Sequence, residues 1–185
     1  MFIQTEETPN PATLKFIPGE PVMTTGTADF TDAEAAKSSP LAERLFALDG
    51  VTGVFLGADF ITVTKGGDKE WHVMKPAVLG AVMDHFSSGA AVITESENQS
   101  GAEALGGDDD EIVSQIKELI ETKVRPAVAQ DGGDIIFHGF EDGIVYLQMQ
   151  GACSGCPSST ATLKSGIENM LQHYVPQVVE VRAVS

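Results

Sequence analysis

The 185-residue sequence contains only two cysteines, Cys153 and Cys156, and two residues separate them. A close pair cannot form a disulfide framework that staples distant segments, and it is typical of a protein from a reducing cytosol. Closed zinc sites and iron–sulfur clusters usually take four protein ligands, which is two more sulfurs than this chain has. If the pair binds metal, we therefore expect a symmetric dimer with the metal on its axis.

Basic residues are also scarce, because 11 Lys and Arg stand against 27 Asp and Glu, for a net charge of −16. Nucleic-acid binding needs a basic surface, and anionic membrane surfaces attract basic segments, so both kinds of partner are excluded. No apolar run approaches the ~20 residues that a membrane-spanning helix requires. The charge itself is most simply explained by solubility.

Several catalytic patterns are missing as well. No Ser/His/Asp or Cys/His arrangement can be read from the spacing, no glycine-rich phosphate loop follows a strand, and no paired carboxylates stand out. Asp131 and Asp134 could suggest a cation site, but the two glycines between them predict a turn. We therefore expect a protein that is not an enzyme.

The start of the chain carries no basic, serine-rich or long apolar leader. We therefore expect the protein to stay in the compartment where it is made, unless the sequence is a processed form.

Composition divides the chain into two small α+β domains, residues 1–94 and 111–185, joined by a flexible acidic linker. The linker, residues 95–110, has six acidic residues, no basic residue and one large apolar residue, so it cannot build a core. The first domain is predicted to contain strands at 2–5, 13–17, 51–56 and 60–64, an extended stretch at 71–74 and a last strand at 92–93. Its helices are predicted to begin at Pro40, with Ser39 as the N-cap, and at residue 75; residues 30–39 are predicted as a loop or short helix.

The second domain is predicted to run helix, hairpin, cysteine loop, helix and strand. Its first helix should bend or break near Arg125, because Pro126 falls inside the apolar stripe. The hairpin strands are predicted at 135–140 and 144–149, around Glu141-Asp-Gly143, the second helix at 158–174 and the last strand at 178–184.

Both cysteines lie in the loop Gly151-Ala-Cys-Ser-Gly-Cys-Pro-Ser-Ser159. Pro157 suits the first turn of the following helix, so Cys156 is expected near its N-cap, where the helix dipole lowers a thiol pKa. Metal binding, a redox-active pair of the thioredoxin kind and a pair of structural thiols all remain compatible with this spacing. His72 and His85 are expected to be surface or packing residues, and neither His138 nor His173 is expected to reach the sulfurs.

Three segments of the second domain resemble the Nfu-type domain, the C-terminal domain of the NifU family of iron–sulfur scaffold and carrier proteins. They are Arg125-Pro-Ala-Val-Ala-Gln-Asp-Gly-Gly-Asp134, Leu147-Gln-Met-Gln-Gly-Ala-Cys-Ser-Gly-Cys-Pro-Ser-Ser-Thr160 and Thr162-Leu-Lys-Ser-Gly-Ile-Glu168. The first domain resembles the N-terminal domain of Nfu proteins through Thr8-Pro-Asn-Pro-Ala-Thr-Leu-Lys-Phe16, Val54-Phe-Leu-Gly-Ala-Asp-Phe-Ile-Thr-Val-Thr64 and Asp84-His-Phe86.

This resemblance implies that Cys153 and Cys156 bind a cluster shared between two chains, with [4Fe–4S] as the expected type and [2Fe–2S] as the other. It also implies an upstream cluster donor and acceptor apoproteins that receive the cluster. Family members of organelles carry a targeting leader, so the start of this sequence favours a bacterial cytoplasmic protein, with the mitochondrial matrix as the alternative if the sequence is a processed form. A thiol–disulfide oxidoreductase that uses Cys153 and Cys156 is the alternative function, and a zinc-stabilised interaction module is a further one. For the first domain we expect partner binding or an influence on delivery.

Overall fold

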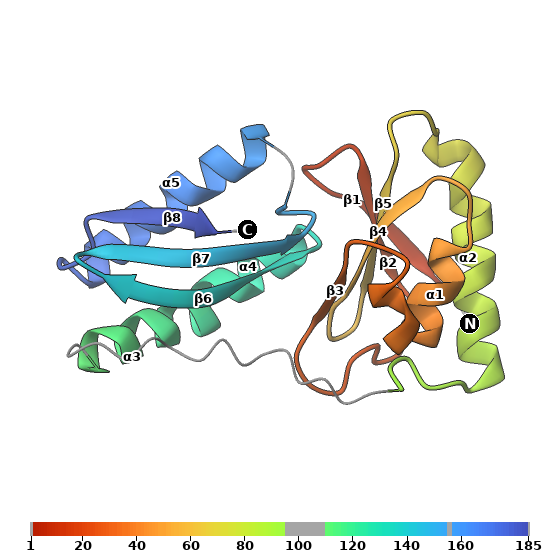
Figure 1. The fold of residues 1–185 in the computed structure, drawn as a ribbon, viewed down its shortest axis with the longest axis horizontal. Coiled ribbons are helices and arrows are strands. Elements are labelled where there is room, and N and C mark those ends of the chain that lie inside the picture. Colours follow the sequence, from red (N-terminus) through yellow and green to blue (C-terminus); the bar gives the residue numbers. More distant parts are fainter. Residues whose placement is uncertain (1, 95–109, 155–156, 185) are drawn as a thin grey trace. The chain divides into compact units, whose positions relative to one another are not determined.

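The computed structural model of the chain describes residues 2–94, 110–154 and 157–184 (Figure 1). The chain folds into two compact units, an N-terminal unit of residues 1–99 and a C-terminal unit of residues 100–185. Each unit combines a sheet with helices, which confirms the predicted α+β class. The predicted flexible linker falls on residues 95–109, outside the described residues, so its limits and its flexibility stay predictions.

The N-terminal unit contains a five-stranded antiparallel sheet in the order β1-β2-β5-β4-β3. Its strands are β1 (Gln4–Glu7), β2 (Thr13–Ile17), β3 (Ala28–Phe30), β4 (Val51–Leu56) and β5 (Ile61–Lys65). β2, the hairpin of β4 and β5, and a strand near the N-terminus were predicted. Strand β3 was missed, because three residues are too few to show an alternating pattern. The strand predicted at 92–93 is wrong: the Val92 carbonyl instead accepts a hydrogen bond from Ser39 Oγ at 2.5 Å.

Helix α1 (Pro40–Phe46) begins where its sequence predicts. Ser39 Oγ accepts a hydrogen bond from the Ala42 N–H at 3.1 Å, and Pro40 takes the first helical position. A short 3₁₀ helix, η1 (Ala35–Ser38), precedes it inside the segment predicted as a loop or short helix. The cap and the proline are local signals, which explains why this boundary was predicted correctly.

Helix α2 (Trp71–Ser88) begins earlier than predicted, so the extended stretch at 71–74 is wrong. The apolar stripe starts at Met74, which is 5% exposed, and continues through Val78 and Val82. Trp71 is fixed by a hydrogen bond of 3.2 Å from its Nε1 to the Pro11 carbonyl. Contacts with the core and with the turn between β1 and β2 therefore set the start of this helix, and Pro76 lies inside it.

His85 is a packing residue of this helix, one of the two alternatives predicted for it. Its side chain is fully buried, and neither ring nitrogen has a hydrogen-bond partner among the described residues. Burial, and then the positive charge of Arg44, lower the pKa of His85 below its usual value. The neutral imidazole is therefore the form that the folded unit accepts.

This lowered pKa predicts a pH-dependent stability. Unfolded His85 takes up a proton below about pH 6.5, so the stability it supports is complete above that pH and is lost as pH falls toward the folded pKa. Burial raises the pKa of Asp29 to about 6, which acts in the opposite direction in the same window. We therefore expect that wild type loses more stability than His85→Leu between pH 7.5 and 5.5.

Urea unfolding followed by the fluorescence of Trp71, the single tryptophan, measures this difference in the N-terminal unit. His72→Gln is the matched control, because His72 is an exposed residue of the same helix. Parallel pH curves for wild type and His85→Leu would contradict the prediction.

The C-terminal unit contains a three-stranded sheet in the order β6-β7-β8. Strands β6 (Gly133–Glu141) and β7 (Ile144–Gly151) form the predicted antiparallel hairpin, and Asp142 and Gly143 take positive φ values of 50° and 80° at its turn. Helix α5 (Pro157–Tyr174) then crosses over, and β8 (Glu180–Val184) pairs parallel to β7. The cysteine loop joins β7 to α5 (Figure 1).

The first helical run of this unit consists of α3 (Asp110–Leu119), a π-helical turn η2 (Ile120–Val124) and α4 (Arg125–Gln130). The predicted interruption near Arg125 takes the form of this π turn, in which the Arg125 N–H donates to the Ile120 carbonyl five residues earlier. The wider turn accommodates Pro126 without a break. The buried stripe therefore continues on both sides of the turn, through Ile116, Ile120, Val124 and Val128.

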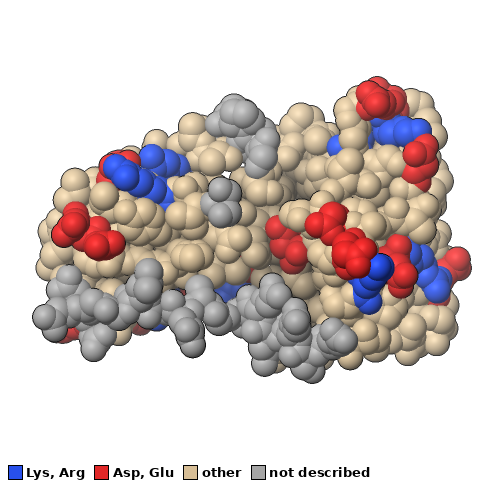
Figure 2. All heavy atoms as spheres, viewed as in Figure 1, with Lys and Arg blue, Asp and Glu red and all other residues tan. Residues whose placement is uncertain are grey.

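Charged side chains lie in small groups on the face drawn in Figure 2, where most visible Lys and Arg atoms stand next to Asp or Glu. This arrangement agrees with the acidic composition of the chain. Among the described residues, no helix combines the length and the apolar character needed to cross a membrane.

Candidate functional site

Cys153 lies in the loop between β7 and α5, and it is only 4% exposed. Its sulfur is packed against Gly133 at the start of β6: a Cβ added to Gly133 would lie 2.5 Å from Cys153 Sγ and 2.8 Å from the Gln150 carbonyl oxygen. Such distances are too short for any side chain. Gly133 is therefore required for space, and it forms one wall of the pocket that holds the sulfur.

Hydrogen bonds shape the loop around Cys153. The N–H and the Oγ of Ser154 donate to the Gly151 carbonyl at 3.1 and 3.0 Å. Thr160 Oγ1, on α5, donates to the Cys153 carbonyl at 3.2 Å. Gly151 takes a φ of 62°, a conformation that side chains disfavour. The loop is therefore tied to the end of β7 on one side and to α5 on the other.

The hairpin brings a second turn to the same place. Gly133 is paired with Gly151, and the Ala152 N–H donates to the Gly132 carbonyl at 3.1 Å. Gly132 has a φ of 78°, which confirms the predicted turn between Asp131 and Asp134. Two turns from different segments therefore enclose Cys153.

The second predicted ligand, Cys156, lies outside the described residues, so its predicted N-cap position and lowered pKa are untested. Helix α5 does begin at Pro157, as expected. Within the described ranges, no group of three or more His, Cys, Asp or Glu side chains could hold a metal ion. The assignment of Cys153 and Cys156 as ligands therefore remains a proposal.

The surroundings of Cys153 are unfavourable for a thiolate. Burial raises the pKa of the Cys153 thiol to about 12, and the negative charges of Asp131 and Asp134 add to the effect. The thiol therefore keeps its proton at neutral pH. A metal ion that takes the Cys153 thiolate as a ligand would have to displace this proton.

An ion pair that the sequence did not reveal supports the glycine turn. Arg125 donates through Nε and Nη2 to the two carboxylate oxygens of Asp134, each at 2.8 Å, and through Nη1 to Glu121 at 2.7 Å. The Asp134 side chain is 5% exposed, and its Oδ1 also accepts from the Ile135 N–H at 2.8 Å. These bonds to Asp134 raise the pKa of the Arg125 guanidinium above its usual value.

Neither histidine of this unit joins the site, as expected. His138 is exposed at the irregular pairing between Phe137 and Gly139, five residues along β6 from Gly133, or roughly 16 Å. His173 is exposed near the end of α5, sixteen residues after Pro157, or about 24 Å along the helix axis.

The sequence analysis missed the roles of Gly133, Arg125 and Asp134 at this site. Their only sequence signal is an arginine at the end of an apolar stripe, before a Gly-Gly turn.

Gly133→Ala is expected to destabilise the C-terminal unit by about 1–3 kcal/mol, because the new methyl group overlaps a sulfur and a backbone oxygen. Urea unfolding monitored by circular dichroism measures the change. Gly139→Ala is the matched control in the same strand, since a Cβ there meets nothing within 4 Å. Equal midpoints for the two variants would show that the Cys153 pocket is not closely packed.

Comparison with known proteins places both units in one family. Residues 3–89 match the family described as scaffold protein Nfu/NifU N terminal, and residues 116–182 match the NifU-like domain. The human protein named NFU1 iron-sulfur cluster scaffold homolog, mitochondrial, is 55% identical over all of this chain and 72% of its own length. The chain belongs to the Nfu/NifU family of scaffold proteins.

Other members of the Nfu/NifU family are also similar. NifU-like protein 4, mitochondrial, from Arabidopsis thaliana is 56% identical over 96% of this chain, which spans 64% of that relative. The solution structure of a NifU-like protein from Saccharomyces cerevisiae is 26% identical, with a TM-score of 0.47, and covers 52% of this chain and 87% of its own.

The names of these Nfu relatives overturn the predicted location. The human and Arabidopsis proteins are both named mitochondrial, so the prediction of a bacterial cytoplasm is wrong. The alternative placed the protein in mitochondria, as these names do, but the names do not specify the matrix. The prediction relied on the first residues of the chain. Because the chain spans only 64–72% of these relatives, its beginning is not informative about location.

Proposed function

We propose that two copies of this chain hold one [4Fe–4S] cluster through Cys153 and Cys156 of each copy and pass it to apoproteins. The observation that carries the proposal is the thiol count: a member of a scaffold family has two cysteines, in a single Cys-x-x-Cys loop. A cluster that takes four thiolates then needs two loops. An upstream donor supplies the cluster, which is cargo, and the chain acts as a carrier and not as a catalyst.

The surroundings of Cys153 suit a ligand that must be held in a defined place. Gly133 leaves room for the sulfur but for no side chain of its own, and the loop is anchored at Gly151 and Thr160. Because the pKa of the Cys153 thiol is high, its proton is lost only when iron binds, so iron binding and proton release occur together. Each copy supplies only two ligands, and a thiolate of the acceptor can replace them one at a time.

In the alternative, a thiol–disulfide oxidoreductase, the burial of Cys153 makes this residue unsuited to be the attacking thiol. The attacking thiol of such an enzyme must be accessible and must ionise near neutral pH. Cys153 is 4% exposed, and its pKa is raised rather than lowered. We therefore expect no turnover of insulin disulfides by the purified protein in the presence of dithiothreitol.

Anaerobic reconstitution with ferrous iron and sulfide tests the proposal. About four irons and four sulfides per two chains, in a brown species with the mass of a dimer, would support it. Half of those amounts would indicate [2Fe–2S], and a colourless dimer with about one zinc would indicate the interaction module. A colourless monomer with a reversible Cys153–Cys156 disulfide would favour redox chemistry.

A further inference from the structure

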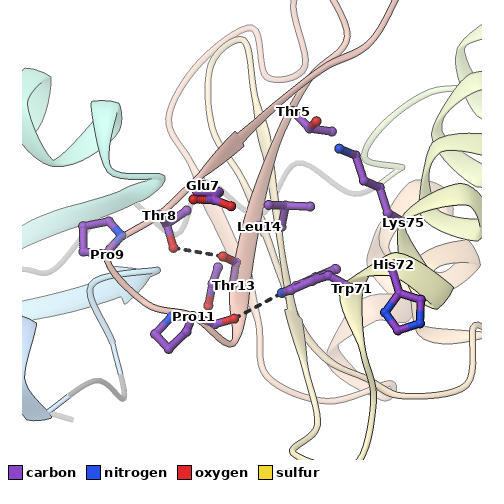
Figure 3. A pocket seen from close by; sticks show the side chains of 10 residues that line it. All are labelled: Thr5, Glu7, Thr8, Pro9, Pro11, Thr13, Leu14, Trp71, His72 and Lys75. Atoms are coloured by element: carbon purple, nitrogen blue, oxygen red, sulfur yellow. Dashed lines mark hydrogen bonds between the residues drawn. The ribbon is translucent and has the colours of Figure 1, made fainter.

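The N-terminal unit contains a groove of about 500 Å³ that cluster carriage does not explain. It lies between strand β1 and the first turns of α2 (Figure 3). Thr5, Glu7 and Leu14 line it from the sheet, and Trp71 and Lys75 line it from the helix. Every lining residue that the structure describes belongs to this unit.

One end of the groove is closed by the rigid turn between β1 and β2. Thr8 Oγ1 donates to the Thr13 carbonyl at 3.0 Å, and Trp71 Nε1 donates to the Pro11 carbonyl at 3.2 Å. Pro9 and Pro11 restrict the backbone of this turn further. The groove is therefore formed before any ligand arrives, which lowers the entropy cost of binding.

The strand beside the groove is an edge strand. Among the described strands β1 pairs only with β2, at one end of the sheet. Along the free side of such a strand, backbone N–H and C=O groups are available to an added strand. An extended peptide can therefore pair with β1 while its alternate side chains enter the groove.

Lys75 gives the groove a charge preference. Its side chain is half-buried and makes no ion pair within the described residues, although the chain carries a net charge of −16. In Figure 3 its amino group points along the groove toward Thr5. A ligand carboxylate at this end would supply the opposite charge that Lys75 lacks.

The spacing of the groove residues matches an extended chain. Trp71 and Lys75 are four helical residues apart, a rise of about 6 Å, and side chains two positions apart on one face of a strand are separated by about 6.8 Å. Glu7 pairs with Leu14 at the Trp71 end, where it repels a second carboxylate. The apolar and acidic subsites are therefore distinct.

We propose that this groove binds an extended segment of a partner protein, added antiparallel to β1. A large apolar residue of the segment packs on Trp71 and Leu14, and an acidic residue two positions later pairs with Lys75. The order follows from the direction of β1, because an antiparallel neighbour passes the Glu7 end before the Thr5 end. This site concerns the N-terminal unit and goes beyond the cluster proposal.

Titration of the full-length protein with the peptide STVTFTDTS tests the site without any cluster. Trp71 is the only tryptophan, so its fluorescence reports binding at the groove itself. We expect a saturable change in Trp71 fluorescence with this peptide. Two control peptides should bind about tenfold more weakly: STVTFTNTS, which lacks the negative charge, and STVTDTFTS, in which the apolar and acidic residues are exchanged.

The protein variant Lys75→Gln should bind STVTFTDTS about tenfold more weakly than wild type does, and it should bind STVTFTNTS with the same affinity as wild type. Lys37→Gln is the matched control, because Lys37 is exposed on η1 and pairs with Glu34 at 2.7 Å. The absence of a saturable fluorescence change with STVTFTDTS would overturn the proposal. Equal affinities of wild type for the three peptides, or equal affinities of Lys75→Gln and wild type for STVTFTDTS, would also overturn it. None of these binding results changes the iron content of the reconstituted protein, so the cluster proposal is tested separately.

Discussion

Cys153→Ser and Cys156→Ser are each expected to abolish retention of the cluster. If two copies share one cluster, a single substitution removes two of its four thiolates, because the change occurs in both copies. A serine hydroxyl is a much weaker ligand for iron than a thiolate, and it leaves the loop nearly unchanged in size. The expected result is therefore loss of colour and iron without unfolding.

Iron and sulfide analysis after anaerobic reconstitution and gel filtration measures this loss, and circular dichroism verifies the fold. Ser154→Ala is the matched control, because Ser154 lies between the two cysteines and removal of its hydroxyl takes away only a hydrogen bond to the Gly151 carbonyl. Full iron content in either serine variant would contradict the shared-cluster proposal.

Arg125→Met is expected to destabilise the C-terminal unit by about 3–5 kcal/mol. Methionine keeps much of the aliphatic stem but removes the guanidinium, and with it two charge-assisted hydrogen bonds to the buried carboxylate of Asp134. Because Asp134 adjoins Gly133, the same change should loosen the turn that packs against Cys153.

A double-mutant cycle separates the lost pairing from the lost packing. Asp134→Asn removes the negative charge that pairs with Arg125, so the double variant Arg125→Met with Asp134→Asn should lose less stability than the sum of the two single changes. Urea unfolding followed by circular dichroism gives the three values. Arg182→Met is the control, since Arg182 pairs with Glu180 at the exposed surface, and little change is expected. Strict additivity in the cycle would contradict the buried pair.

Elements with strong local signals were predicted correctly from the sequence. Ser39 and Pro40 set the start of α1, and Asp142 with Gly143 forms the turn of the hairpin. In both cases two neighbouring residues restrict the backbone, whatever the rest of the chain does.

Elements whose limits depend on distant contacts were predicted less well. Helix α2 begins at Trp71 because Met74 packs into the core and Trp71 bonds to Pro11, far away in sequence. The π turn before Pro126 likewise keeps Ile120 and Val124 buried on one stripe. Periodicity reveals that such a stripe exists but not how the backbone adjusts to hold it.

For the site, the sequence by itself determined how many sulfurs the chain can offer, their spacing and their place before a helix, and hence that a four-thiolate cluster would need two copies. Only the tertiary structure decided that Cys153 is buried against Gly133 and that Arg125 holds Asp134 beside it. Ligand count is a property of composition, whereas burial and pairing depend on which distant segments the sheet and helices bring into contact.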